Sequence, residues 1–423
     1  MRRVAVTGLG VVSPMGTGRE TFFRGLREGR SGLGPIRRFN AGGLAATRAG
    51  EVPGLEELKG RLVETRGHLP PIGGSTLRET LDRDAKIAFA LAAADEAMED
   101  GGVLSLGAGT LLHLGASLET FSLGSVGPVK GKSLPEIERL MTRASLRTPL
   151  DRACALIELK HGRAGLSLTN CSACAAGLQA LGQAFRAVAR GGFERALAGA
   201  FDSLINPLGV GGFQLLGALA PDDPEPGPPL CRPFDKDRRG LVMGEGAAVM
   251  VLEPLDKALA EGRKIYGEIL GYGASLDAAS LSAPDPAGSG AYRSMEAALR
   301  QAGLRPEEVD HLSAHGTGTL LNDPAEAAAV RRLFPNWQKM PAAAVKSMTG
   351  HAIAAAGALE AAACLMTLGE RLVPPNIGLR NVGADCELDH VMGEARKFEG
   401  NIVATNSFGF GGQNATMIFR GLG

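Results

Sequence analysis

The position of Cys174 in this sequence is the one best suited to covalent chemistry. An apolar, strand-like run at 166–168 gives way to small residues around Cys174, and apolar side chains then recur at helical spacing from Leu178. The pattern predicts a strand-to-helix turn at which the free amides of the first helical turn point at the sulfur. The helix dipole there favours thiolate over thiol, and the backbone N–H of Cys174 itself can donate to an attacked carbonyl oxygen. The sequence therefore predicts a nucleophilic cysteine.

Two other interpretations of Cys174 stay open at this point. The spacing Cys171-x-x-Cys174 is that of a redox dithiol, although a thioredoxin-like domain is far shorter than this chain and a zinc site would need a second CxxC. The simplest alternative is a small buried cysteine that packs a helix.

Further candidates for chemistry lie in the second part of the chain. His315 follows an apolar strand on the turn HGTGT, which also supplies the hydroxyls of Thr317 and Thr319. Lys346 ends another strand, and His351 is expected in the first turn of an alanine-rich helix. A cation is disfavoured at a helix N-terminus, so His351 should be neutral and able to donate an N–H to a carbonyl oxygen. A turn histidine bonded to backbone and a phosphate cradle remain alternatives for His315.

Two more motifs accompany these residues. The run Asp323-Pro324-Ala325-Glu326 is a good helix start, so capping is the simplest role for Glu326. In NSFGFGGQN, Phe408 lies on a loop that can flex through Gly409 and the glycines that follow, and a glycine-rich turn around core phenylalanines is the simpler interpretation.

Together, a thiol, two histidines and a lysine suit acyl transfer. The cysteine would take an acyl group from a thioester. Two neutral histidines would then donate hydrogen bonds to the carbonyl of a second thioester, which must carry enolate charge if a malonyl group loses carbon dioxide.

Hydrophobic periodicity predicts the elements that position these residues. Strands are expected near 3–12, 111–115, 195–202 and 247–252, and helices at 19–27 and 82–100. Loops are expected at 41–75 and in the glycine-rich stretch that contains Gly211-Gly212-Phe213. The early Gly8-x-Gly10-x-x-Ser13 is a poor dinucleotide-binding fingerprint, because no helix opens directly from it.

After Asp256 the order of elements is expected to repeat. A strand near 265–271, a helix at 292–302, the strand and turn HLSAHGTGT, the helix after Lys346 and strands at 401–405 and 415–419 follow the order of the first part. This weak self-similarity predicts two duplicated βαβ-rich halves, 1–255 and 256–423. Cys174 and His351 then lie at the starts of equivalent helices.

Composition limits the class of protein. The chain has 423 residues, of which 44% are hydrophobic and 21% charged, which is typical of globular proteins. Its formal net charge is zero, which gives no reason to expect nucleic acid or an anionic membrane as partner. No apolar run is expected to reach the ~18–20 residues that span a bilayer. Six scattered cysteines indicate reduced thiols and a cytoplasmic location.

From end to end, the sequence resembles the β-ketoacyl-acyl-carrier-protein synthases of the elongating type, in the thiolase superfamily. The motifs that carry the resemblance are SACAAG around Cys174, FDKDRRGLVMGEGAAVMVLEP, AHGTGTLLNDPAEA, KSMTGHAIAAAGALE and NSFGFGGQNA. The resemblance implies a five-layered αβαβα fold of two thiolase-like halves and a dimer. It also implies an acyl carrier protein that brings substrates on its phosphopantetheine, with no tightly bound cofactor and no metal.

Catalytic roles follow from the same resemblance. Cys174 is implied to accept the acyl group, and His315 and His351 to promote decarboxylation and stabilise the enolate. Lys346 and Glu326 are implied to hold the histidine network.

The resemblance also implies two roles for Phe408. Its amide would complete an oxyanion hole with that of Cys174, and its ring would gate the acyl pocket. The implied substrate-binding residues are Thr317 and Thr319, which meet the phosphopantetheine arm, and Phe213, Leu118 and Gly409.

Several stretches depart from the family pattern. Leu118-Glu119-Thr120 stands where a glycine-rich turn is usual and puts a carboxylate near the pocket floor, and the segment Leu150 to Cys154 is also unusual. Gly217 stands where many relatives carry an arginine that meets the carrier protein. Lys130 and Lys132 could supply that basic contact instead.

The expected activity is decarboxylative Claisen condensation of a Cys-bound acyl chain with malonyl-carrier protein in fatty-acid elongation. The departures make a ketosynthase of a specialised type II polyketide or polyene pathway the alternative, working alone or paired with a chain-length-factor-like subunit. A binding or scaffolding subunit without turnover is the alternative from another class, and the intact set of a thiol, two histidines and a lysine argues against it.

Overall fold

A computed structural model gives the structure of the chain over residues 1–118, 133–136, 139, 149–222 and 230–422. Glu119, Thr120, Lys130 and Lys132 lie outside these described residues, so the predictions that involve them stay predictions.

One large mixed sheet runs through the described part of the molecule. Its first set of neighbouring strands is β1 (Val4–Ser13), β8 (Glu245–Pro254), β7 (Arg195–Ser203), β5 (Thr110–Gly115) and β6 (Leu166–Asn170). The second set is β9 (Gly267–Leu276), β16 (Gln413–Arg420), β15 (Ile402–Gly409), β10 (His311–Ser313) and β11 (Pro341–Ala343), with β13 (Asp389–His390) at the edge. The antiparallel pair of β1 and β9 joins the two sets through Val4 to Val6.

The two sets pair their strands in the same way. In the first, β1–β8 and β8–β7 are antiparallel, whereas β7–β5 and β5–β6 are parallel. In the second, β9–β16 and β16–β15 are antiparallel, whereas β15–β10 and β10–β11 are parallel. A parallel pair needs a crossover connection, so in each set a helix follows the strand that leads into the site.

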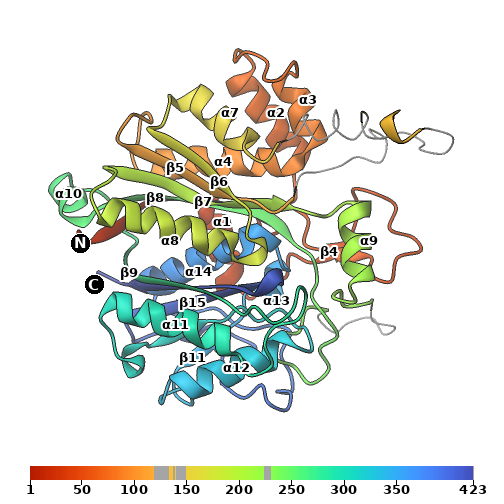
Figure 1. Cartoon of the computed structure of the whole chain (residues 1–423), viewed down its shortest axis with the longest axis vertical. Helices are drawn as coiled ribbons and strands as arrows, with labels where there is room; N and C mark the ends of the chain where they lie inside the picture. Colours follow the sequence, from red (N-terminus) through yellow and green to blue (C-terminus); the bar gives the residue numbers. More distant parts are fainter. Residues whose placement is uncertain (119–132, 137–138, 140–148, 223–229, 423) are drawn as a thin grey trace.

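Helices cover both sets of strands and fill the space between them (Figure 1). The helices α2 (Leu55–Arg66), α3 (Leu77–Arg83), α4 (Ala85–Asp100) and α7 (Arg152–His161) lie above the first set in this view. The helices α8 (Ala176–Ala189) and α14 (Ala356–Glu370) lie between the sets, and α11 (Ser289–Ala302) and α12 (Asn322–Leu333) lie below the second set. The remaining described elements are α1 (Arg19–Arg27), α9 (Pro207–Leu215), α10 (Leu255–Ala260), α13 (Lys346–Thr349), β2 (Gly16–Thr17), β3 (Gly34–Pro35), β4 (Arg48–Ala49), β12 (Leu372–Val373) and β14 (Arg396–Lys397), together with short 3₁₀ turns.

The two central helices cross at a pair of glycines. A Cβ on Gly177 of α8 would lie 2.8 Å from the backbone nitrogen of Ala358 in α14. A Cβ on Gly357 of α14 would lie 2.9 Å from Cγ of Leu178 in α8. Because glycine has no Cβ, the backbones approach closely at this point and the N-terminal ends of both helices come together.

The helix from Ile353 to Glu370 corrects one expectation from the sequence. Among the described residues it is the stretch that is long and apolar enough to cross a membrane, and 89% of it is buried inside the protein. A helix surrounded by other elements is apolar on all sides because every face is in the core. The expectation that no apolar run reaches the length needed to span a bilayer was therefore wrong for this helix.

Two segments expected to be loops are helices. In α2, Leu55, Leu58 and Leu62 have helical spacing, and they pack into the apolar cluster under α4. In α9, the side chain of Asn206 accepts hydrogen bonds from the amides of Leu208 (3.1 Å) and Gly209 (2.9 Å), which caps a helix that includes Gly211-Gly212-Phe213. Because both stretches contain glycine and proline, the sequence analysis recognised neither the helical spacing in α2 nor the cap of α9.

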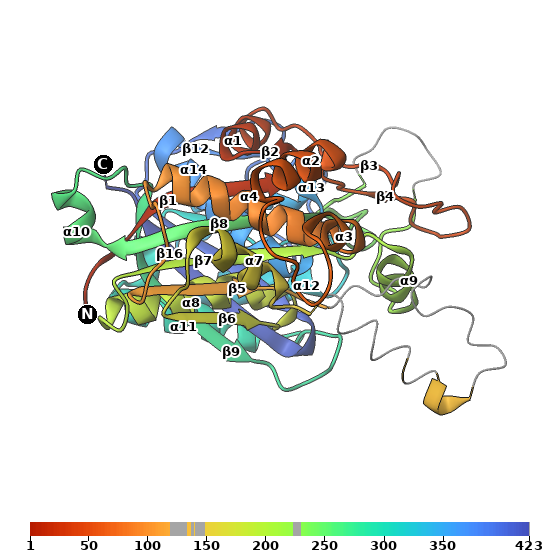
Figure 2. The ribbon, with the colours of Figure 1, turned by 90° about the horizontal axis from the view of Figure 1, so that it is seen from above.

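The two ends of the chain meet on one carboxylate. Glu268 in β9 accepts hydrogen bonds from the guanidinium groups of Arg3 (2.7 Å) and Arg420 (2.6 Å). Figures 1 and 2 show both ends on the same side of the molecule, next to α10 and opposite α9.

Candidate active site

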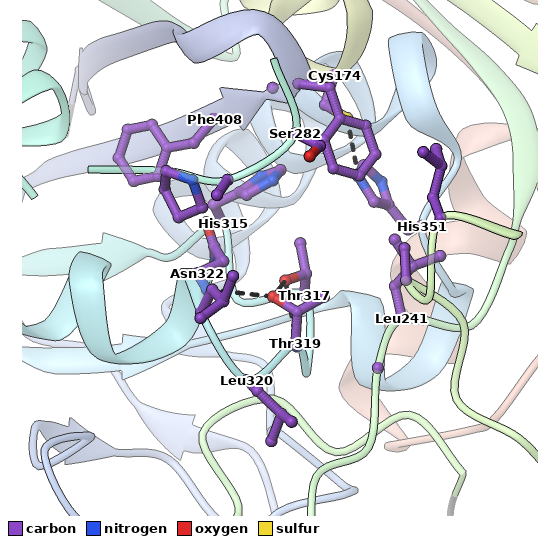
Figure 3. Close-up of a pocket in the computed structure, with 18 of the residues that line it drawn as sticks. Cys174, Leu241, Ser282, His315, Thr317, Thr319, Leu320, Asn322, His351 and Phe408 are labelled. Atoms are coloured by element: carbon purple, nitrogen blue, oxygen red, sulfur yellow. Dashed lines mark hydrogen bonds between the residues drawn. The ribbon is translucent and has the colours of Figure 1, made fainter. Parts of the chain in front are cut away.

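Cys174 lines a cavity of about 430 Å³ together with His315 and His351 (Figure 3). It sits in the 3₁₀ turn Ala173–Ala175, between β6 and α8, as the sequence predicted. Ala173 has a φ of 48°, a left-handed conformation that is strained for a residue with a Cβ. The side chain of Cys174 is 3% exposed.

His351 faces the sulfur from the other half of the chain. Its Nε2 lies 3.1 Å from Sγ of Cys174. His351 precedes a 3₁₀ turn (Ile353–Ala355) that leads into α14, so it stands just before the helix instead of in its first turn. The φ of Ile353 is 47°, so this turn repeats the strained geometry of the turn that carries Cys174.

Burial determines the protonation of Cys174. Removal from water raises the pKa of its thiol to about 12. The charge of Lys346 and the backbone N–H groups of Phe410 and Cys174 lower the pKa, but by less. The sequence predicted a stabilised thiolate; the helix-start amides act as expected, but desolvation outweighs them and the resting group is a thiol.

A second histidine, His315, lines the same cavity. Its ring centroid is 5.3 Å from that of His351, with the two planes at 83°. Burial is the largest cause that lowers the pKa of both rings well below the usual value, and the charge of Lys346 adds to it. Both imidazoles are therefore neutral near pH 7, as the sequence predicted for His351.

Lys346 binds His315 through its ammonium group. Its Nζ donates to the backbone oxygen of His315 (2.6 Å) and lies 3.1 Å from Nδ1 of the same residue. It also forms a buried ion pair with Glu360 of α14. Burial raises the pKa of Glu360 to about 7.

Glu326 and Asp323 shape the loop of His315. Glu326 accepts from the amides of His315 (2.8 Å) and Gly316 (2.9 Å). Asp323 accepts from the amides of Phe234 (2.7 Å) and Thr317 (3.1 Å). The contacts of Glu326 confirm that it holds the loop of His315, as the resemblance implied. The simpler interpretation, that it caps its own helix, is wrong, because α12 begins at Asn322 and the side chain binds the loop instead.

The loop after β15 shows that the backbone amide facing Cys174 is not the one expected from the sequence. Phe408 still belongs to β15, where it pairs with Asn414, and its ring lies 5.7 Å from that of His315. The chain leaves the strand after Gly409, and the backbone N–H that turns towards Cys174 is that of Phe410. A Cβ on Gly409 would lie 3.0 Å from the backbone nitrogen of Cys174, so only glycine lets this loop come so close.

Two threonines, Thr317 and Thr319, line the same cavity. The hydroxyls of Thr317 and Thr319 are 2.9 Å apart, and Thr319 Oγ1 accepts from the amide of Asn322 (3.2 Å). Figure 3 shows them between Leu320 and the two histidines.

Phe213 and Leu118 line a second, more apolar cavity of about 570 Å³. Leu216 borders both cavities, and the rings of Phe213 and Phe410 lie 5.8 Å apart near the boundary. Leu150 also lines this second cavity, whereas Cys154 is buried in α7 with its sulfur 3.4 Å from Oγ1 of Thr169.

The sequence analysis missed three residues of the site. Glu360 could have been noticed as the single carboxylate in the run AIAAAGALEAAACLM. Asp202 is fully buried, and it accepts from the amide of Ala354 (3.0 Å) in the turn that follows His351. Phe410 could not be identified from the sequence. The residue at which β15 ends determines which backbone N–H faces Cys174, and the sequence does not show where that strand ends. In the described part of the chain, no three His, Cys, Asp or Glu residues are grouped as a metal site requires.

Known proteins resemble this chain over its full length. The family descriptions "Beta-ketoacyl synthase, N-terminal domain" and "Beta-ketoacyl synthase, C-terminal domain" match residues 1–258 and 266–380. The chain is 36% identical to 3-oxoacyl-[acyl-carrier-protein] synthase 2 of Synechocystis sp., over 99% of this chain and 98% of that protein.

Solved structures also resemble this chain over its full length. The ishigamide ketosynthase/chain length factor has a TM-score of 0.85 and 36% identity, with 100% of both chains covered. A type II polyketide synthase acyl-carrier protein in complex with its ketosynthase has a TM-score of 0.86 and 28% identity, again with 100% of both chains covered. Matches to both domains of one family along a single chain, with more than a third of residues identical to a relative of equal length, mean that this chain belongs to the β-ketoacyl synthase family.

Proposed function

We propose that this protein is a β-ketoacyl-acyl-carrier-protein synthase that condenses a Cys174-bound acyl chain with malonyl-carrier protein in fatty-acid elongation. The observation that carries the proposal is the buried group of one thiol and two neutral imidazoles, with His351 Nε2 3.1 Å from the sulfur. Such a group can take up an acyl chain and then stabilise negative charge on a second thioester.

In the first half-reaction, Cys174 attacks the carbonyl carbon of an acyl thioester. The sulfur–carbon bond forms as the thiol proton passes to His351, and the carrier-protein thiolate leaves and takes up that proton. Nδ1 of His351 has no partner among the described residues, so no hydrogen bond there fixes its tautomer and Nε2 can accept or donate. The amides of Cys174 and Phe410 would stabilise the oxyanion, a role that the sequence assigned to Phe408.

In the second half-reaction, His315 and His351 donate N–H groups to the malonyl thioester oxygen. The bond to the carboxylate breaks, carbon dioxide leaves, and the electron pair forms an enolate. Its carbon attacks the acyl carbon on Cys174, and the cysteine leaves as a thiolate that takes up a proton from water to restore the resting thiol. Lys346 and Glu326 would act as positioning residues, since both bind the loop of His315.

Separating the two half-reactions tests the proposal. Cys174→Gln is expected to release carbon dioxide from malonyl-carrier protein but to form no condensation product, since it keeps both histidines. His315→Ala is expected to lose most decarboxylation. Cys386→Ala, which changes a thiol that lines neither cavity, is the control and is expected to condense normally. Loss of decarboxylation in Cys174→Gln would contradict the division of labour.

The fold that we propose is the five-layered αβαβα arrangement of thiolase-like halves, 1–255 and 256–423. It is supported by the shared strand order of the two sets and by two equivalent turns with a positive φ, at Ala173 and Ile353. In this arrangement each half supplies one helix start to the site.

We further propose that an acyl carrier protein delivers the substrates, that Thr317 and Thr319 bind its phosphopantetheine, and that the protein is a homodimer. Phe213 and Leu118 would line the pocket for the acyl chain, since they border the second cavity. No tightly bound cofactor is needed for this chemistry. The free thiols of all six cysteines suit the cytoplasm.

A specialised polyketide or polyene ketosynthase is the second candidate. The 36% identity to the ishigamide ketosynthase/chain length factor favours it. The test is mass analysis of products from malonyl-carrier protein and a panel of saturated and polyunsaturated primers. Extension of saturated primers over a broad range of lengths supports fatty-acid elongation. Extension only of unsaturated primers, or only with an added homologous subunit, supports the specialised pathway.

A further inference from the structure

We propose that Asp202 is a positioning residue whose carboxylate fixes the turn after His351 and so keeps the ring of His351 against the sulfur of Cys174. This inference rests on the proposed function, because it concerns the same reaction. Asp202 stands near the end of β7, in the first half of the chain, whereas His351 belongs to the second half. The residue therefore acts across the boundary between the halves.

The carboxylate of Asp202 joins two backbone segments. Its Oδ2 accepts a hydrogen bond from the amide of Ala354 (3.0 Å), and its Oδ1 accepts one from the amide of Ser203 (2.9 Å). Asp202 is fully buried, so without its side chain the N–H of Ala354 would be left unpaired and away from water. Asp202 lines neither of the two cavities described above, so it acts through this contact and does not touch substrate.

The ring of His351 depends on its backbone for its position. Among the described residues, Nδ1 of this ring has no hydrogen-bond partner, and Nε2 faces the sulfur of Cys174 (Figure 3). The backbone N–H of His351 donates to the oxygen of Val242 (2.7 Å), and its oxygen accepts from the amide of Gly244 (2.9 Å). These two bonds fix the backbone of His351 itself, but not the chain that follows it.

The chain that follows His351 enters a strained turn. The φ of Ile353 is 47°, a conformation that is unfavourable for a β-branched residue. A strained turn keeps its shape where the surrounding contacts hold it. The bond from Ala354 to Asp202 is such a contact, one residue after the strained position.

The equivalent turn of the first half shows which amide Asp202 binds. Both turns have the same backbone bond: the amide of Ala175 donates to Ser172 (3.1 Å), and the amide of Ala355 donates to Ala352 (3.0 Å). Superposed on these bonds, the amide that Asp202 binds corresponds to that of the nucleophilic cysteine. One amide is proposed above for the oxyanion hole, and its counterpart already carries an acidic oxygen.

The strand that carries Asp202 also has a counterpart in the other half. Asp202 pairs with Gly246 at the second-last position of β7, and Phe408 pairs with Asn414 at the second-last position of β15. Each half thus ends a strand against the helix start of the other half. The strand of Phe408 leads to a backbone amide that faces Cys174, whereas the strand of Asp202 supplies a side-chain acceptor.

Two substitutions of Asp202 test the inference. Asp202→Ala removes the acceptor, and its kcat for carbon dioxide release from malonyl-carrier protein is expected to fall about tenfold, a barrier increase of about 1.4 kcal/mol. Its KM is expected to change less than about twofold, because Asp202 does not touch substrate. Asp202→Asn keeps an oxygen that can accept from Ala354, so its kcat should stay within about threefold of the natural value. If Asp202→Ala does not fold, Asp202→Leu, which has nearly the same shape and no acceptor, replaces it with the same expectation.

A double-mutant cycle with His351→Ala shows whether Asp202 acts through this histidine. His351→Ala alone is expected to slow decarboxylation. Adding Asp202→Ala to it should slow the reaction by less than about twofold more, because the ring that Asp202 positions is already absent. Independent losses that multiply would show that Asp202 acts by another route, and would overturn the proposal.

The matched control is Asp310→Ala. The carboxylate of Asp310 also accepts from two backbone amides, those of Asn401 (2.7 Å) and Ile402 (2.9 Å), and it lines neither cavity. This variant loses the same kind of contact and should keep its kcat. If it slows decarboxylation as much as Asp202→Ala, a general loss of stability explains both effects and the proposal fails.

The remaining outcomes separate this inference from the proposed function. An unchanged kcat in Asp202→Ala contradicts the positioning role but not the proposed function. An equal loss of kcat in Asp202→Asn and Asp202→Ala would show that the acceptor for Ala354 is not what matters, and a raised KM would show contact with substrate; either result overturns the inference. If the unaltered enzyme releases no carbon dioxide from malonyl-carrier protein, the proposed function itself fails.

Discussion

At the scale of single residues, the site depends on groups that are neutral because they are buried. The thiol of Cys174 has a pKa of about 12, and the imidazoles of His315 and His351 have pKa values well below the usual one. The three reacting groups are therefore uncharged at rest, and charge develops on them only as bonds are made and broken. An enzyme of this kind stabilises the transition state more than the resting state.

The pKa of Cys174 predicts how its alkylation depends on pH. Below a pKa of about 12, the thiolate fraction rises about tenfold per pH unit, so labelling by iodoacetamide should rise steadily from about pH 6 to pH 9. Mass analysis of the peptide that contains Cys174 measures the rate, in a Cys171→Ser background that removes the exposed thiol. A plateau below pH 8 would mean that a preformed thiolate exists and that the helix start outweighs burial.

The pKa of Glu360 predicts a second pH effect. Since burial raises it to about 7, Glu360 is ionised above that pH and protonated below it. Ionised Glu360 anchors Lys346 under His315, so decarboxylation should fall as the pH drops through 7. Glu360→Gln should lose this inflection and be about tenfold slower at pH 8, a barrier increase of about 1.4 kcal/mol.

The matched control for that variant is Glu370→Gln, at the other end of α14. Its carboxylate forms an ion pair with Arg27. Both of these side chains are partly exposed to solvent, whereas Glu360 is buried. It should keep the inflection and the rate. An unchanged profile in Glu360→Gln would show that the ion pair has only a structural role.

The sequence identified most residues of the candidate site but not their exact contacts. Cys174, His315, Lys346 and His351 could be found because each has a reactive side chain next to a turn or helix start. Glu326 was also found, and it binds the loop of His315 as the resemblance implied. The local pattern alone suggested a cap, because a carboxylate three residues into a helix has the same pattern whether it caps that helix or binds a neighbouring loop. Phe410 was missed, since backbone amides carry no sequence signal.

At the scale of elements, the crossing of α8 and α14 sets the distance between the sulfur and His351. Gly177 and Gly357 occupy equivalent places in the two helices, four residues after Ala173 and Ile353. By the same count, Cys171 occupies the place of His351, and Ala354 that of Cys174. The two reactive residues thus lie at different positions of two turns that share a positive φ, at Ala173 and Ile353.

A larger residue at the crossing should separate the two helices. A Cβ on Gly357 would lie 2.6 Å from Oγ of Ser407 and 2.9 Å from Cγ of Leu178. Gly357→Ala should therefore lower the free energy of unfolding by about 1–3 kcal/mol and reduce kcat at least tenfold. Urea unfolding and condensation kinetics measure the two effects.

Gly369→Ala is the control in the same helix. A Cβ there meets nothing within 4 Å, so this variant should be as stable as the natural protein or more stable, by up to about 1 kcal/mol. If both variants behave alike, close packing at the crossing does not position the site.

Helices and strands with a regular spacing of apolar residues were predicted well, whereas segments of mixed composition were not. The helix expected at 19–27 is α1, and the one expected at 82–100 is α4, which starts at Ala85 because Asp84 caps it. The helices α2 and α9 were missed, since glycine and proline near them suggested loop. Their helical form depends on packing against α4 and on the cap at Asn206, which only the folded chain supplies.

At the scale of the whole molecule, β6 stands at one end of the described sheet. Leu166 and Leu168 point to the same side of this strand and are 43% and 39% exposed. An edge strand with unpaired backbone groups and exposed leucines is suited to pairing with another chain. This edge is where we expect the proposed homodimer to form.

Charge on that edge should prevent the dimer. Leu166→Glu/Leu168→Glu is expected to convert the protein to a monomer, because two carboxylates from each copy would face one another without partners. Light scattering coupled to size-exclusion chromatography measures the mass. Leu104→Glu, on a different exposed leucine, should stay dimeric. A double variant that remains a dimer would place the interface elsewhere.

The arrangement of the two halves could be predicted only in outline. Four matching stretches gave the order of the elements, but the pairing of β1 with β9 through three residues has no sequence signal. Such pairing is decided by packing of the whole sheet, which no local pattern describes.

The shared binding of Arg3 and Arg420 to Glu268 has a consequence for chain connectivity. Because Arg3 and Arg420 both bind Glu268, a short linker could join the two ends of this sequence, and new ends could be made at the exposed turn around Gly262. The gene would then encode the histidines and the lysine before the cysteine. A circularly permuted enzyme of this design should assemble the same site, which would show that the order of the two halves along the chain is incidental to catalysis.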